Sequence, residues 1–391
     1  MYSHFINQRK LISMSKTGFI IFMVLFLFSC NSDLSEFQSE NFIKFYGNGQ
    51  GSIAYDAEEL SEGGFLVVGY ENTLEFNKQI LLIRTDEYGN TVWKKLFGDE
   101  DQEEATKIQP FEDGYLIAGS SVNDFTTERK GFLLKVSTNG DSLWYKDYKG
   151  KSKFQINDVL INQTSIYIVG SSDTLDSSNS DYFIAELDFN GDQIWDRVIP
   201  GIGEEQFTNV FLNSEGNIIT VGSTNSVVSS ENVFYVSIAK LSSVGIPVHS
   251  KNISAVSNQF PGGAVYKNGE VFIVINDEVQ GQICIRAYND NLEKNWEQEH
   301  DLNYTVRSFE MTSDDNFILG SVESSNIRIV KISNTGELIP ATTGFKTFPG
   351  IVNTIKSTSD NGFLIIGATT SDYGSMMQLI KTSSDDFLLN N

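Results

Sequence analysis

The sequence predicts an all-β protein, a seven-bladed β-propeller of four-stranded antiparallel blades, with a ring closed by an N-terminal strand that joins the last blade. Three observations lead to this prediction. Tryptophan recurs at intervals of 51 residues, as Trp93, Trp144 and Trp195. An apolar segment that ends in glycine recurs along the chain, and a segment just after residue 40 matches the one that carries the tryptophan. A period near 50 residues is typical of repeat architectures, in which each unit buries its apolar faces against its neighbours.

The segment that ends in glycine is apolar at consecutive positions, as expected of a strand that is covered on both faces. Its copies are 65–69, 115–119, 166–170, 218–222, 317–320 and 363–367, with a weaker copy at 272–276 that ends in asparagine. These copies predict seven units.

A second apolar segment follows each of these copies. The second segments are 80–83, 132–136, 182–187, 234–239, 283–287, 327–332 and 377–380. Turns with Asn-Gly or a related pair come next, at Gly89, Gly140, Gly191 and Gly336, and supply the positive φ that a tight hairpin needs. A weaker strand precedes each glycine-ended segment, so that each unit holds four antiparallel strands. Sheets of this kind, stacked radially, form a propeller.

The tryptophan begins the strand after the turn, and we expect its ring to cover the hairpin and to wedge against the next blade. In the fourth unit Val248 is expected in this place, in the fifth Trp296, and in the sixth Ile339 or a neighbour. These residues are interpreted as structural.

The two ends of the chain predict how the ring closes. Residues 379–391 leave no room for a full fourth strand in the seventh unit, whereas 42–47 (FIKFYG) resembles 93–98 (WKKLFG) in character. The N-terminal strand should therefore complete the last blade and remove two open sheet edges. The propeller domain is predicted to span 41–391.

Residues 1–29 are interpreted as an export signal, with Arg9, Lys10 and Lys16 before an apolar segment at 18–28. Eleven apolar residues span only about 16 Å as a helix, too little for a bilayer core. The segment ends Leu27-Phe28-Ser29-Cys30, which resembles the lipobox of bacterial lipoproteins, and the resemblance implies lipidation of Cys30. The alternative is an ordinary cleaved signal followed by a chance cysteine.

Residues 30–40 then form a polar tether. In the enterobacterial sorting scheme Asn31, in place of aspartate, implies delivery to the outer membrane. We therefore expect a protein of the outer membrane or cell surface that meets the membrane through a lipid anchor only.

The chain is strongly acidic, with 28 Lys and Arg against 51 Asp and Glu. Loss of residues 1–29 removes three basic residues and gives a net charge of about −26, which repels nucleic acid and anionic lipid headgroups. If Cys30 carries a lipid, Cys284 has no disulfide partner, and its apolar surroundings predict a buried small side chain.

The phrase at 131–148 (GFLLKVSTNGDSLWYKDY) resembles the repeat of β-propeller lipoproteins from Bacteroidota. It is also similar to the quinoprotein repeat, although the period here is nearer 50 than 40 and Asn-Gly-Asp replaces the Thr-Gly turn. These resemblances imply a fold and no particular activity. No cofactor is expected, since no motif here identifies the charged ligands that a quinone would need.

Catalytic and metal-binding motifs are not recognisable. The histidines of the mature chain, His249 and His300, stand in outer-strand or hairpin contexts, and neither belongs to a ligand cluster or a relay motif. The run at 188–192 has calcium-like spacing but is the third copy of the hairpin turn. We predict no catalytic, metal or cofactor residues.

Candidate binding residues lie in connections instead. Asp99, Asp101, Glu103 and Glu104 form the densest acidic run, between an outer strand and the next unit, where either a calcium site or a solvated loop is possible. The loops between second and third strands are rich in Ser, Asn, Asp and Thr. Their aromatic residues Phe76, Phe125 and Tyr373 are candidates for contact with a sugar or a partner.

These features predict a non-enzymatic binding or scaffolding propeller that holds a protein or glycan partner at one face of the ring. One alternative is an assembly factor for outer-membrane proteins. Another is a glycan-active hydrolase or lyase with carboxylates in the central channel. Converging Asp and Glu with an Arg or Tyr in the channel would favour the enzyme, and a lining of Val, Ala and Ser would argue against it.

Overall fold

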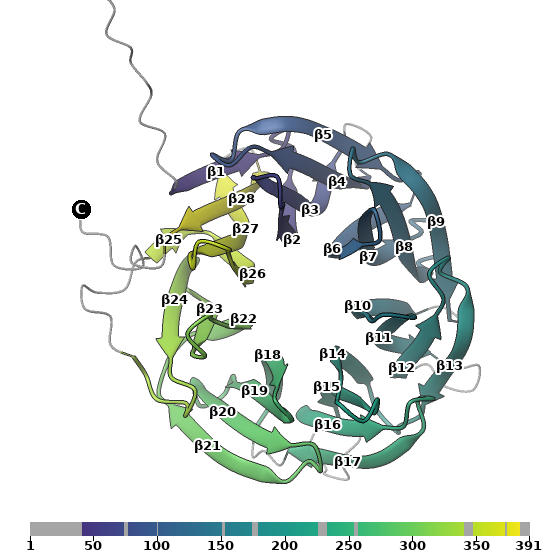
Figure 1. Ribbon diagram of the computed structural model, residues 1–391, viewed down its shortest axis with the longest axis vertical. Coiled ribbons are helices and arrows are strands. Elements are labelled where there is room, and N and C mark those ends of the chain that lie inside the picture. The colour runs from purple at the N-terminus through teal and green to yellow at the C-terminus, as the bar shows by residue number, and fades with distance from the viewer. Residues whose placement is uncertain are drawn as a thin grey trace, which may run out of the picture. The chain divides into compact units, whose positions relative to one another are not determined.

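The computed structural model describes residues 41–73, 77–99, 101–150, 153–173, 179–225, 233–253, 257–339, 347–371 and 374–383. This part of the chain forms 28 strands and no helix, and so no helix that could cross a membrane. The strands make seven four-stranded antiparallel sheets, which Figure 1 shows arranged around one axis. The predicted all-β, seven-bladed propeller is confirmed. The export signal, Cys30, the tether, Phe76 and Tyr373 lie outside the described residues.

Each blade begins at the axis and ends at the rim (Figure 1). The innermost strands are β2 (Ser52–Glu59), β6 (Gln102–Phe111), β10 (Phe154–Ile161), β14 (Glu205–Leu212), β18 (Gln259–Lys267), β22 (Thr305–Met311) and β26 (Ile351–Ser357). The second strands are β3 (Phe65–Asn72), β7 (Gly114–Val122), β11 (Ile166–Asp173), β15 (Ile218–Thr224), β19 (Glu270–Asp277), β23 (Phe317–Glu323) and β27 (Phe363–Ser371).

The third strands are β4 (Lys78–Thr85), β8 (Arg129–Ser137), β12 (Ser180–Leu187), β16 (Tyr235–Leu241), β20 (Gln282–Asn289), β24 (Asn326–Ile332) and β28 (Gly374–Thr382). The outermost strands are β5 (Thr91–Phe97), β9 (Ser142–Lys149), β13 (Gln193–Ile199), β17 (Pro247–Ile253), β21 (Lys294–His300), β25 (Thr347–Pro349) and β1 (Phe42–Tyr46). In the seventh blade the sheet order is β1-β28-β27-β26, and β1 pairs with β28 from Phe42↔Lys381 to Tyr46↔Met377.

The apolar core is divided among the interfaces between blades. Seven clusters of buried side chains each combine residues from two neighbouring blades. This division follows from the second and third strands, which are buried on both faces; in β11 all eight residues are buried. Cys284 lies in the cluster between the fourth and fifth blades and is buried, as expected.

The repeated glycine of the second strand is explained by a bulge in the innermost strand. Every innermost strand has a register shift near its middle, and in the first blade the extra residue is Tyr55. A Cβ on Gly69, opposite the bulge, would lie 1.9 Å from the carbonyl oxygen of Ile53. Gly119, Gly170, Gly222 and Gly367 meet the same obstacle at 1.9 to 2.1 Å. Any larger residue would therefore push two strands of one blade apart.

The recurring tryptophan packs on the turn glycine of the next blade. A Cβ on Gly140 would lie 2.4 Å from Cη2 of Trp93, and one on Gly245 would lie 2.4 Å from Cζ3 of Trp195. Both glycines have positive φ, 75° and 74°. The pairs Trp144 with Gly191 and Trp296 with Gly336 repeat this contact. The predicted wedge between blades is confirmed, and the turn glycine is needed both for its φ and for the space that the indole takes.

The fourth blade corrects one prediction. The ladder pairs Lys240 with His249, the register that Arg84 and Trp93 have in the first blade, so His249 and not Val248 occupies the tryptophan position. Val248 is 62% exposed at the rim. In the fifth blade the turn residue is Leu292, at φ 60° and buried. Because its side chain fills the space that glycine leaves elsewhere, an indole has no room in the fourth blade.

Strand β1 makes the same contacts with the first blade that β9 makes with the third. Phe42 packs on Gly89, where a Cβ would lie 2.6 Å from its ring. Tyr46 donates its hydroxyl hydrogen to the carbonyl of Gly89 at 2.7 Å, as Tyr148 does to Gly191 at 2.7 Å. The N-terminal strand therefore takes the role of an outermost strand in both position and chemistry.

We predict that a chain that starts at residue 49 loses its cooperative unfolding transition, because β28 is then an open edge and Gly89 loses its covering ring. A chain that starts at residue 41 keeps β1 and serves as the control. Thermal unfolding followed by circular dichroism measures both. Equal transitions in the two chains would contradict a closing role for β1.

Candidate functional site

A cavity of about 400 Å³ lies between the innermost strands, which is within the size range of small-molecule sites. Its wall comes from β2, β6, β18, β22 and β26 and from one residue of β19. The lining residues are Tyr55, Thr106, Lys107, Phe260, Pro261, Asn276, Thr305, Val306, Arg307, Asn353 and Thr354.

The β-bulges position the wall, since a bulge re-aims the side chain that it inserts. The extra residues are Tyr55, Thr106, Asn157, Thr208, Gly262, Arg307 and Asn353. Two of them join neighbouring blades: Asn157 donates from Nδ2 to the carbonyl of Phe207 at 2.7 Å, and Asn353 does so to Ala54 at 2.8 Å. The two asparagines at bulges thus bond to the neighbouring innermost strand, whereas Thr106 and Thr208 bond within their own blades.

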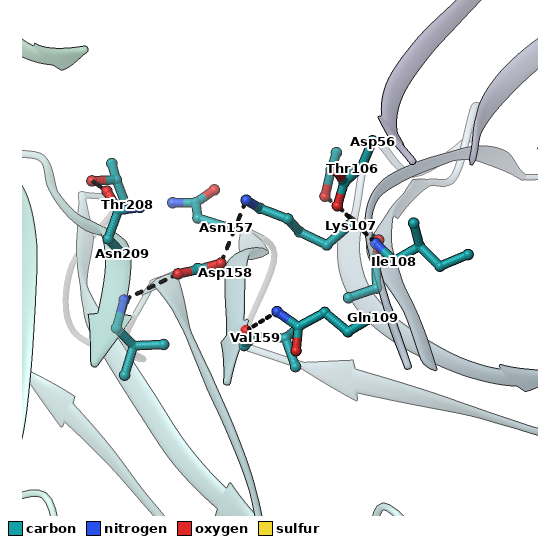
Figure 2. A network of polar contacts seen from close by, with 12 residues as sticks. Asp56, Thr106, Lys107, Ile108, Gln109, Asn157, Asp158, Val159, Thr208 and Asn209 are labelled. Atoms are coloured by element: carbon teal, nitrogen blue, oxygen red, sulfur yellow. Dashed lines mark hydrogen bonds and ion pairs between the residues drawn. The ribbon is translucent and has the colours of Figure 1, made fainter. Parts of the chain in front are cut away.

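The residues after the bulges extend this bonding (Figure 2). Asp56 accepts the backbone N–H of Ile108 at 3.1 Å, and Asp158 accepts that of Val210 at 3.1 Å, each in the following blade. The Nζ atom of Lys107 lies 3.6 Å from a carboxylate oxygen of Asp158, which raises the pKa of this lysine. Both aspartates are buried. Their charge is therefore committed to holding adjacent blades together.

Further charged groups face the same region from the seventh, first and sixth blades. The Nζ atom of Lys356 lies 3.0 Å from Asp56 and also forms an ion pair with Glu58. Burial raises the pKa of Glu310 to about 7; Lys356 and Lys107 oppose this rise, and Asp56 and Glu58 add to it. The channel thus holds converging carboxylates, and two lysines compensate part of their charge.

Tyr55 and Arg307 are larger than the Thr, Asn and Gly residues at the other bulges. Burial and then the nearby charge of the Glu104 carboxylate raise the pKa of Tyr55. Glu104 is also paired with Lys78. Arg307 is exposed and forms no ion pair with any described residue. The wall can therefore offer the donors of one uncommitted guanidinium to a ligand.

The structure separates the acidic run that the sequence singled out. Glu104 lies near Tyr55, a residue of the cavity wall. Asp101 accepts from Asn123 at 2.6 Å and lies 3.4 Å from Nζ of Lys130. Glu103 is buried, and its Oε1 accepts the backbone N–H of Asp99 at 3.2 Å. In the described part of the chain, no three acidic, His or Cys residues lie together as metal ligands.

The remaining sequence candidates lie apart from the cavity. Phe125 is 89% exposed in the loop between β7 and β8. A ring nitrogen of His300 lies 2.8 Å from the carbonyl oxygen of Gly336, a contact between blades, and His249 is exposed at the rim. Phe76 and Tyr373 fall outside the described residues.

A second, smaller cavity of about 270 Å³ lies between the third and fourth blades. It is lined by Gln155, Ser171, Ser180, Glu204, Glu205, Gln206, Ser223 and Phe234. Sequence reasoning identified neither cavity. A usable signal existed for the larger one, because Tyr55, Thr106, Asn157 and Thr208 follow the same interval of 51 residues as the tryptophans.

No protein-family model matches the chain, and no curated protein matches it either. Its similarity to solved structures is one of fold, at TM-scores near 0.5. Virginiamycin B lyase from Staphylococcus aureus with quinupristin has a TM-score of 0.53 and 10% identity over 87% of this chain and 99% of the lyase. Drosophila Plexin A in complex with Semaphorin 1b has a TM-score of 0.53 and 8% identity, over 88% of this chain and 86% of that one.

The extracellular domain of a putative hybrid two-component system from B. thetaiotaomicron has a TM-score of 0.50 and 11% identity, over 86% of this chain and 39% of that one. The structural neighbours are β-propeller proteins with varied roles, among them a lyase and an extracellular sensor domain. At such low identity the likeness shows the fold alone.

We predict that Glu103 makes stability depend on pH. Burial raises the pKa of this carboxyl group to about 8, and Oε2 has no hydrogen-bond partner among the described residues. Between an ordinary glutamate pKa of about 4.5 and 8, the folded chain keeps a proton that the unfolded chain has lost, so the free energy of unfolding falls as pH rises. Urea unfolding at pH 5, 7 and 9 measures this fall.

The Glu103→Gln variant should lose much of the fall between pH 5 and 9, since its side chain does not ionise. Glu128 is an exposed carboxyl in the loop between β7 and β8, and the Glu128→Gln variant should keep the wild-type dependence. An unchanged dependence in Glu103→Gln would show that Glu103 does not retain its proton in the folded chain.

Proposed function

We propose that this protein is a non-enzymatic binding or scaffolding propeller, tethered to the outer membrane through a lipid on Cys30, and that the central cavity takes part in holding a protein or glycan partner. The observation that carries the proposal is Arg307, exposed and without an ion pair to any described residue, in the wall of a cavity of about 400 Å³. Near it, Asp56 and Asn353 of the innermost strands bond to neighbouring blades. A residue of the repeat that makes no bond between blades is a candidate for ligand recognition.

The anchoring part of the proposal is supported by the sequence at the N-terminus. A basic segment, a short apolar segment and Ser29-Cys30 precede a polar tether of about ten residues, and β1 starts at Phe42. Such a tether, about 30 Å when extended, would keep the ring within reach of the membrane surface. A ring held in this way can present one face to molecules at the surface of the cell.

The similar folds fit a binding role without naming a partner. Those structures are a lyase with quinupristin, Plexin A in complex with Semaphorin 1b, and the extracellular domain of a putative hybrid two-component system. Propellers thus hold small molecules and proteins alike, and any partner of this chain has to be identified from its own residues.

A hydrolase or lyase is the second candidate, and one observation favours it. Asp56, Glu58 and Glu310 converge in the channel, with Tyr55 and Arg307 nearby, and Glu310 has a pKa of about 7, suited to a general acid. Against it, Asp56 accepts two backbone N–H groups and faces Lys356 at 3.0 Å. Glu58 is paired with the same lysine. A glycosidase needs two available carboxyl groups, so binding is the better supported function.

The proposal predicts that the full-length protein, crosslinked in native membranes, recovers one stoichiometric partner. The Arg307→Gln variant should recover less of it, and Arg129→Gln, an exposed arginine outside the cavity, should recover as much as the wild type. Mass spectrometry and glycan staining identify the partner. Recovery of the machinery that assembles outer-membrane barrels would favour the assembly factor instead. Equal recovery by the Arg307→Gln variant would remove the cavity from the proposal.

A further inference from the structure

We propose that the central cavity binds a carboxylate-bearing sugar, a hexuronate unit of an acidic glycan, with Arg307 on the carboxylate and Tyr55 and Phe260 beside the ring. This inference rests on the proposed binding function and names the class of ligand. It begins from a comparison of equivalent positions within the repeat, because seven copies of one strand reveal which residues do structural work and which do not.

The bulge position shows this division clearly. In the third and seventh blades Asn157 and Asn353 bond to the backbone of the next blade. In the sixth blade the hydroxyl of Ser308 accepts the N–H of Ile355 at 2.9 Å, the contact that Asp56 and Asp158 make after the bulges of the first and third blades. Arg307, at the bulge itself, makes no hydrogen bond to a described residue of the next blade. It keeps a long cationic side chain at the cavity wall, whereas the bulge residues of the second, third, fourth and seventh blades are Thr or Asn.

The charge of Arg307 is the one that a ligand can use. Lys107 lies 3.6 Å from Asp158, and Lys356 is paired with Asp56 and Glu58, so both lysines already face carboxylates. No described carboxylate lies within ion-pair distance of Arg307. Arg129 and Arg197 also form no ion pair with a described carboxylate, but they bond to Gln155 and to the carbonyl of Asp196, whereas Arg307 lines the cavity. The planar fork of the Arg307 guanidinium matches a carboxylate, which it can bind through two parallel hydrogen bonds.

Two aromatic side chains define the rest of the ligand. Tyr55 comes from the first blade and Phe260 from the fifth, and the innermost strands of these blades lie on opposite sides of the axis (Figure 1). Thr106, Thr305 and Thr354, which carry hydroxyl groups, line the same cavity. A hexuronate has a carboxylate, several hydroxyl groups and a ring face of C–H groups. The cation of Arg307, the threonines and the two aromatic side chains suit these three features in turn.

Glu310 lies on the same strand as Arg307, and its negative charge would oppose an acidic ligand. Its raised pKa, about 7, leaves this group partly protonated at neutral pH, and Lys356 and Lys107 act on it as well. Its opposition to an anion is therefore smaller than that of an exposed glutamate. The charge of Glu310 is therefore compatible with one ligand carboxylate at Arg307.

Isothermal titration calorimetry on the full mature chain tests the inference. The probes are trimers of galacturonate, of glucuronate and of mannuronate, with neutral galactotriose and hexaglutamate as comparisons. At least one uronate trimer should bind at least 10-fold more tightly than galactotriose. Its affinity should fall about 10- to 100-fold in Arg307→Gln, as expected for loss of a charged bidentate pair, and should also fall in 0.5 M NaCl.

Arg129→Gln is the matched control and should bind as the wild type does, and equal melting transitions show that both variants are folded. Three results would overturn the inference: no uronate trimer binds, galactotriose binds equally well, or Arg307→Gln keeps full affinity. If hexaglutamate alone binds and depends on Arg307, the ligand is an acidic protein segment; the glycan inference then fails while the proposed binding function stands.

Discussion

The contact between an aromatic ring at the rim of one blade and the turn of the next blade is the constraint on which the rest of this propeller depends. It occurs as Trp93 on Gly140 and recurs around the ring, with Phe42 on Gly89 where the chain ends meet. The two partners constrain each other. A turn at positive φ favours glycine, and the ring needs glycine because a Cβ would occupy its place. Among the described residues this pair sets the blade spacing at five interfaces, whereas His249 and Leu292 take its place between the fourth and fifth blades.

The same logic orders the blades at the axis. At the axis a β-bulge has the part that the aromatic ring has at the rim. The glycine opposite the bulge leaves space for the bulged backbone, and side chains next to the bulge bond to the innermost strand of the next blade. Two layers of contact between blades, one at the rim and one at the axis, leave the apolar clusters between them. A side chain that takes part in neither layer of contacts, such as Arg307, is available to bind a ligand. The proposed ligand contact of Arg307 therefore lies at a position where the repeat pattern is broken.

Most of the fold could be predicted from the sequence because the period of the repeat is visible in it. Apolar residues at consecutive positions identified the doubly buried strands, Asn-Gly identified the hairpins, and Trp93, Trp144 and Trp195 identified the outer strands. The exception was the fourth blade, where apolar character suggested Val248 although the ladder places His249 opposite Lys240. Only the side chain of Leu292, in the next blade, explains why an indole is missing there.

The site was harder to predict, since the innermost strands are polar and vary from blade to blade. Tyr55 and Arg307 stand in weak strand patterns, and the interval of 51 residues does not itself show that the bulge residues of blades one, two, six and seven line one cavity. The acidic run at 99–104 was conspicuous for its composition. In three dimensions it divides: Glu103 is buried inside a blade, and Glu104 meets Tyr55. Composition pointed to this region, and only the geometry assigned its residues to different tasks.

The most direct measurement of the coupling between ring and turn is a double-mutant cycle on the free energy of unfolding. Gly140→Ala should cost about 2–4 kcal/mol, from positive φ plus overpacking against Trp93. Gly216→Ala, at φ 78° with nothing within 4 Å of its Cβ, should cost only about 1–2 kcal/mol. In a Trp93→Ala background the cost of Gly140→Ala should fall to that of Gly216→Ala. An unchanged cost in that background would contradict the account.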